Sequence, residues 1–169
     1  MTGNAEETRS RVAAAHRTAL TLVLAFAMSI LIYAGVGLLI LGMRGTNTRA
    51  ELPYAFYAAA AILAIGSIVI RRAQMHRMKL EVVAGTRGVE GLIKHLVSAT
   101  ILAASIAEVI GVLSLLVAFF GGDRGDVIRL GVVALAVSFY NYPRRSAWQR
   151  VVDYFSATAA AAGQSSLGL

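Results

Sequence analysis

One uninterrupted apolar run constrains the fold of this chain more than any other feature. Residues 96–120 read LVSATILAASIAEVIGVLSLLVAFF, with a single charged residue, Glu108, at the middle. At about 1.5 Å per helical residue, 25 residues cross the roughly 30 Å hydrocarbon core of a bilayer. We therefore predict that this run spans a membrane.

The rest of the chain has the composition of a membrane protein. It is 57% hydrophobic and 15% charged, with a mean hydropathy of +0.68, which is too apolar for an ordinary soluble domain. The first apolar run is too long for the core of a signal peptide, so we expect it to be retained. We predict an all-α polytopic protein: a single domain over residues 1–155, a flexible tail over 156–169, and four transmembrane helices at about 19–43, 53–70, 96–120 and 127–142.

The second and third spans are predicted to form one long helical hairpin. Helical spacing of apolar residues continues past Ile70, and the sequence Gly-Thr-Arg-Gly at 85–88 then supplies a turn. A second turn-rich segment, 44–49, ends near Pro53, which suits the first turn of the second span. The second span is rich in alanine, which favours close packing, and its aromatic end is typical of an interfacial belt: Tyr54, Phe56 and Tyr57.

A short amphipathic helix is predicted after the fourth span. Trp148, Val151, Val152 and Phe155 recur at i, i+3, i+4 and i+7, and arginines flank them. We expect this helix to lie on the membrane surface. The residues expected to contact lipid headgroups or a partner are Arg71, Arg72, Arg77, Lys79, Arg144, Arg145 and Trp148.

The basic residues also predict an orientation. Of the 16 Lys and Arg residues, twelve fall on the side that holds the N-terminus, the 71–95 hairpin tip and the C-terminus, and four fall on the other side. By the positive-inside rule, we expect both termini and the tip to be cytoplasmic. We expect the membrane to be the inner membrane of a bacterium.

Small residues form one stripe along the third span, where another helix can approach closely: Ala104, Ala107, Gly111, Ser114 and Ala118. Glu108 lies at the edge of this seam. Burying an ionised carboxylate in hydrocarbon costs roughly several kcal/mol of free energy. We therefore expect Glu108 to be protonated, paired, or turned toward a polar interior. The candidate partners on other helices are Ser29, Tyr33, Ser67, Ser138 and Asn141.

The segment around Glu108 resembles a known family. AEVIGVLSLLVAFF, residues 107–120, is similar to the second helix of the ring subunit c of F-type ATP synthases, with Glu108 as the acid and Gly111 three residues later. The resemblance covers the hairpin over 54–120 and implies that Glu108 takes up a proton or a sodium ion. The whole chain also resembles small four-span bacterial membrane proteins of unassigned function that contain such a hairpin.

Other chemistries find little support in the sequence. Cysteine is absent, the three histidines lack metal-ligand spacing, and no nucleophile accompanies a base, so we expect no enzyme, metal site or cofactor. The basic residues flank apolar runs, so we expect lipids rather than nucleic acid as partners, and no small-molecule substrate is evident. Two functions remain open: a structural or accessory subunit of a homo-oligomer or larger membrane complex, and an ion-translocating subunit that uses Glu108.

Overall fold

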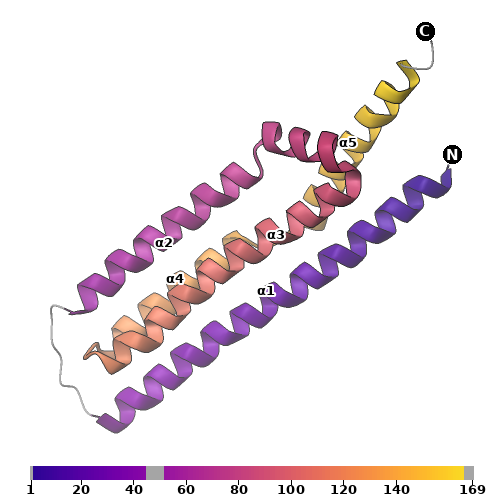
Figure 1. Ribbon diagram of the computed structural model, residues 1–169. Helices are drawn as coiled ribbons and strands as arrows, with labels where there is room; N and C mark the ends of the chain where they lie inside the picture. Colours follow the sequence, from indigo (N-terminus) through magenta and orange to yellow (C-terminus); the bar gives the residue numbers. More distant parts are fainter. Residues whose placement is uncertain (1, 45–51, 166–169) are drawn as a thin grey trace.

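The computed structural model describes residues 2–44 and 52–165, and every element in these ranges is a helix. This confirms the predicted all-α class (Figure 1). The predicted loop at 44–49 lies almost wholly outside the described residues, as do residues 166–169. The helices are α1 (Thr2–Arg44), α2 (Leu52–Gln74), α3 (Arg77–Phe119), α4 (Arg124–Tyr140) and α5 (Arg145–Ser165).

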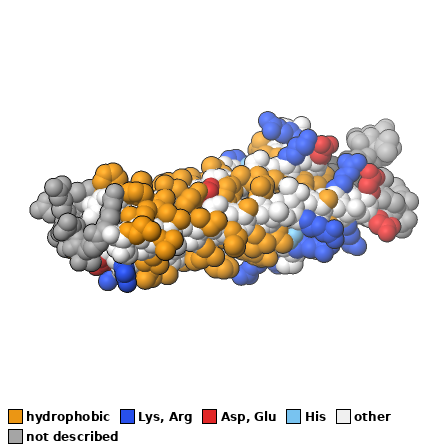
Figure 2. Space-filling model, turned by 90° about the horizontal axis from the view of Figure 1, so that it is seen from below, with side chains coloured by type: hydrophobic (Ala, Val, Ile, Leu, Met, Phe, Trp, Pro, Cys, Tyr) orange, Lys and Arg blue, Asp and Glu red, His pale blue; other side chains and the backbone are white. Residues whose placement is uncertain are grey.

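Three of these helices are long and apolar enough to cross a membrane. The qualifying stretches are Glu6–Met43 in α1, Tyr54–Gln74 in α2 and Met78–Phe119 in α3. They indicate a membrane protein. Figure 2 shows hydrophobic side chains as a broad band along the middle of the molecule, with Lys and Arg gathered mainly toward one end.

The first four helices run side by side with alternating direction (Figure 1). The main core lies where α1, α3 and α4 meet, and its fully buried members include Ile30, Ile110 and Leu130. The N-terminus of α1, the α2–α3 turn and α5 share one end of this bundle (Figure 1).

The hairpin tip changes direction at two places rather than one. Gly88 interrupts α3 with φ 63° and ψ −167°, a conformation that is essentially restricted to glycine, and it lies in the predicted turn at 85–88. The first break, between Gln74 and Arg77, has no Gly or Pro to mark it and was not predicted. His95 stabilises this arrangement, since its Nε2 lies 3.1 Å from the carbonyl oxygen of Gln74.

A second core lies at the tip end, where α5 packs on α1 and α3. Its fully buried members include Val12, Leu92 and Val152. The apolar face of α5, which we predicted to lie on the membrane surface, is therefore covered largely by protein. The reason is that α1 begins at Thr2 rather than near residue 19, so that its additional turns supply a protein surface for α5. The helix also continues to Ser165, into the stretch predicted as a tail.

Candidate functional site

Glu108 lies in the C-terminal third of α3 and meets α1. The Tyr33 hydroxyl donates to Glu108 Oε1 across 3.3 Å, and the Glu108 side chain is half-buried. One helical turn away, a Cβ added to Gly111 would lie 2.8 Å from Ile30 Cγ1 and 3.3 Å from Ile30 Cα. The absence of a side chain at Gly111 thus allows α1 to approach closely enough for Tyr33 to reach the acid.

The structure buries the whole predicted small-residue seam. Ser114 donates its hydroxyl proton to the Gly111 carbonyl oxygen, 2.6 Å away, so the hydroxyl is paired within its own helix. Gly37 of α1 passes over the same stripe, with Ala118 Cβ 3.5 Å from the position that a Gly37 Cβ would occupy. The buried seam residues are Ala104, Ala107, Gly111, Ser114 and Ala118.

Of the five candidate partners of Glu108, Tyr33 is the one bonded to it. Ser29 donates to the Ala25 carbonyl oxygen of its own helix. Two other candidates bond each other, since Asn141 Nδ2 donates to Ser67 Oγ at 2.8 Å. Glu108 and its tyrosine are therefore separate from the polar cluster at the end of α4.

That cluster is built around Arg71, which the sequence assigned to headgroups or a partner. Arg71 instead donates to the carbonyl oxygen of Tyr140 and to Asn141 Oδ1, the latter at 3.4 Å, and its guanidinium lies 5.3 Å from the centre of the Tyr140 ring. It satisfies a carbonyl in the last turn of α4, where helices leave such groups unpaired. The residue therefore joins α2 to α4.

A second polar contact joins α2 to the start of α4. Tyr57, predicted as part of an aromatic belt, donates its hydroxyl proton to Asp126 Oδ1 at 2.6 Å. Asp126 and Asp123 form a reciprocal capping box, and Arg129 Nη1 lies 3.6 Å from Asp126 Oδ1. The sequence signal for this cap is the pair of aspartates three residues apart, at positions 123 and 126.

The other residues predicted to contact lipid headgroups or a partner differ in how exposed their side chains are. Arg72, Lys79, Arg144 and Arg145 are exposed at the tip end, whereas the side chain of Arg77 lies outside the described part. Trp148, which was predicted to contact lipid headgroups or a partner, is only 4% exposed and packs edge-on against His16, with 5.6 Å between ring centres. His16 Nε2 in turn lies 3.0 Å from the Pro143 carbonyl oxygen.

The fold and these contacts define a helical membrane protein whose long apolar helix carries a carboxyl group bonded to a tyrosine. No group of three or more His, Cys, Asp or Glu residues that could hold a metal ion occurs within residues 2–44 and 52–165. No protein-family model, curated protein or solved structure matches the chain.

Proposed function

We propose that this protein is a non-enzymatic structural or accessory subunit of a homo-oligomer or larger complex in the bacterial inner membrane. The observation that carries this proposal is the pairing of polar groups. In the described part of the chain, every buried side-chain nitrogen and oxygen atom has a hydrogen-bond partner. Paired polar groups hold helices together, whereas a catalytic site needs groups directed at a substrate.

We infer four membrane spans, with α4 as the fourth. At 17 residues α4 is short for a span, but it lies beside α3 and exposes large apolar side chains, including Val132 and Phe139. Both termini and the α2–α3 turn then face the cytoplasm, in line with the excess of basic residues on that side. The arginines of α5 would lie near the headgroups at the same surface.

The outer face of α2 is the surface that we assign to subunit contacts. Ala58 and Ala61 are exposed there beside Ile62 and Ile65. A Cβ added to Gly66 would meet nothing within 4 Å, so this part of α2 has space for another helix. Small residues let helix backbones approach closely in a bilayer, which favours helix association over simple lipid contact.

Single cysteines test this assignment, because the chain contains none. We would introduce Ala61→Cys on α2 and, as a matched control, Val132→Cys on the outward face of α4, then oxidise native membranes. The proposal predicts dimers or heavier adducts for Ala61→Cys and monomer for Val132→Cys. Monomer for both variants would contradict it.

Ion translocation is the second candidate, and the half-buried state of Glu108 favours it. An ionisable residue inside a membrane is a functional candidate by default, and the resemblance of 107–120 to subunit c assigns this acid to ion binding. Two observations favour the accessory role instead. First, Tyr33 of α1 contacts Glu108 on the face at which the acid of a rotor subunit would have to meet the stator. Second, α2 contains a single glycine, whereas the inner helix of the subunit c family contains repeated glycines.

Dicyclohexylcarbodiimide, which attacks protonated carboxyl groups in apolar surroundings, separates the two functions. Ion translocation predicts labelling of Glu108 that falls as the pH rises or as sodium binds, and loss of proton or sodium flux in Glu108→Gln. The accessory role predicts labelling that does not respond to sodium, and unchanged flux. Glu108→Gln also serves as the control for labelling at other carboxyl groups.

A further inference from the structure

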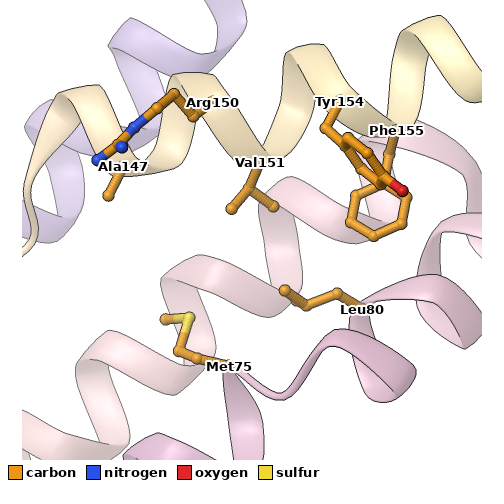
Figure 3. A pocket seen from close by; sticks show the side chains of 7 residues that line it. All are labelled: Met75, Leu80, Ala147, Arg150, Val151, Tyr154 and Phe155. Carbon is orange, nitrogen blue, oxygen red and sulfur yellow. The ribbon is translucent and has the colours of Figure 1, made fainter.

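A groove lies between α5 and the turn that joins α2 to α3 (Figure 3). Its volume is about 450 Å³, within the range of roughly 300–1,000 Å³ that is typical of sites for small ligands. Most of its lining is apolar. The residues that line it are Met75, Leu80, Ala147, Arg150, Val151, Tyr154 and Phe155.

The groove has one cationic end. Arg150 Nε donates to the Ser146 carbonyl oxygen at 3.3 Å, which directs the guanidinium back over Ala147, toward the start of α5 (Figure 3). The aromatic side chains of Tyr154 and Phe155 lie at the other end (Figure 3). A ligand that follows the groove would therefore meet a positive charge at one end and apolar groups along the rest.

Two more arginines are close along the chain to residues that line the groove. Arg71 precedes the lining residue Met75 by one helical turn, and Arg144 precedes Ala147 by three residues. The Arg144 carbonyl oxygen accepts the Ala147 backbone N–H at 3.0 Å, so Arg144 directly precedes the start of α5, toward which the Arg150 guanidinium is directed (Figure 3). Within the described residues no ion pair links Arg71, Arg144 or Arg150 to an acid, so no acid in that part of the chain is seen to neutralise the charge of this end.

We propose that this groove binds one anionic phospholipid. The phosphate lies between Arg144 and Arg150, and one acyl chain lies over Met75, Leu80 and Val151. Guanidinium groups bind phosphate through charge-assisted hydrogen bonds, and the apolar lining requires an apolar tail. A peptide segment suits the groove less well, because its backbone amides would meet few polar partners there.

The proposal goes beyond the role of the protein as a subunit and is tested separately. Trp148 is the only tryptophan of the chain, and it lies next to the lining residue Ala147, so it can report on a bound lipid. We would place the full chain in phosphatidylcholine vesicles and add brominated phosphatidylglycerol or brominated phosphatidylcholine. The proposal predicts that the fluorescence of Trp148 is quenched in a saturable way, and that half-quenching needs a lower mole fraction of brominated phosphatidylglycerol than of brominated phosphatidylcholine.

Variants matched in charge separate this site from general attraction to an anionic surface. Arg144→Gln with Arg150→Gln should raise the half-quenching mole fraction about tenfold, because charge-assisted bonds are lost. Arg72→Gln with Arg145→Gln removes the same charge from two exposed arginines that the proposal does not place at the phosphate, and should change it less than about twofold. Ala147→Phe should fill the groove and abolish saturation, while circular dichroism shows that the fold is kept.

Three results would overturn the proposal. Equal quenching by both lipids would show that the groove does not select anionic lipid. Equal losses in the two double variants would show that the basic surface acts diffusely. Absence of quenching together with weaker self-association of Ala147→Phe would show that the groove is instead a contact between copies of the chain.

Discussion

The contact between Gly111 and Ile30 can be tested by the addition of one methyl group. In Gly111→Ala the new Cβ would lie 2.8 Å from Ile30 Cγ1 and 3.3 Å from Ile30 Cα. Ile30 is 0% exposed, so its side chain has little room to move, and its Cα belongs to the backbone of α1. Helix α1 must shift away from α3 or the Ile30 side chain must leave its rotamer.

Two opposing effects set the magnitude. Replacing glycine by alanine inside a helix stabilises it by about 1 kcal/mol. Overpacking a tight contact costs about 1–3 kcal/mol, and the 2.8 Å distance to Ile30 Cγ1 is shorter than real Cβ contacts. We therefore expect Gly111→Ala to lower the free energy of unfolding by about 0–2 kcal/mol, whereas the same change at an open position should raise it. The shift of α1 should also weaken the hydrogen bond from Tyr33 to Glu108.

The assay is unfolding in mixed micelles with an increasing mole fraction of sodium dodecyl sulfate, followed by circular dichroism and Trp148 fluorescence. Gly35→Ala is the matched control, because it lies on α1 and its added Cβ would meet nothing within 4 Å. Ile30→Ala in the Gly111→Ala background removes the clashing atom and should show a positive coupling in a double-mutant cycle. Equal stability changes in Gly111→Ala and Gly35→Ala would refute the close approach of α1 and α3.

Three further predictions concern the polar contacts and the orientation. Tyr57→Phe removes the hydrogen-bond donor to Asp126, whose side chain is 12% exposed, and should lower the free energy of unfolding by about 1.5–3 kcal/mol in the same assay. The control Tyr54→Phe, at a position that is 73% exposed, should change it by less than about 0.5 kcal/mol. Asn141→Leu removes the partner that Ser67 and Arg71 share, and should destabilise the protein by about 1–3 kcal/mol. Asn141→Asp keeps the oxygen that Arg71 contacts, so an equal loss of stability in this variant would argue against that contact. Cysteines at Lys79 and Arg124, both exposed at opposite ends of the bundle, should react with an impermeant maleimide from the cytoplasmic and the opposite side respectively, and the reverse pattern would contradict the inferred orientation.

The sequence predicted the helical class and the apolar stretches because both depend on composition and periodicity. It placed Glu108 beside another helix and named Tyr33 among five partners, but it had no means of choosing, because the choice depends on how α1 rotates against Gly111. It missed the inward roles of Tyr57 and Arg71. The sequence pattern of an amphipathic side chain at a membrane interface predicts a headgroup contact unless a protein partner is known. The partners of Tyr57 and Arg71 lie about 70 residues away along the chain, so the local pattern does not indicate them.

Trp148 shows the same limit for packing. Its helical stripe with Val152 and Phe155 correctly indicates one buried face, but the sequence does not say what covers that face. The face is covered by protein because α1 extends back to Thr2. The sequence before residue 19 is polar and contains arginines, so it did not indicate that this part of α1 is helical and packs against α5.

The most direct test of the proposed function is the mass of the assembly. The protein would be extracted from its own membrane into polymer-bounded lipid discs and measured by native mass spectrometry. The account predicts species that contain several copies of the 17.8 kDa chain, or one copy together with another subunit, and predicts that they survive in Glu108→Gln. A single 17.8 kDa chain with lipid alone, at every expression level, would contradict it.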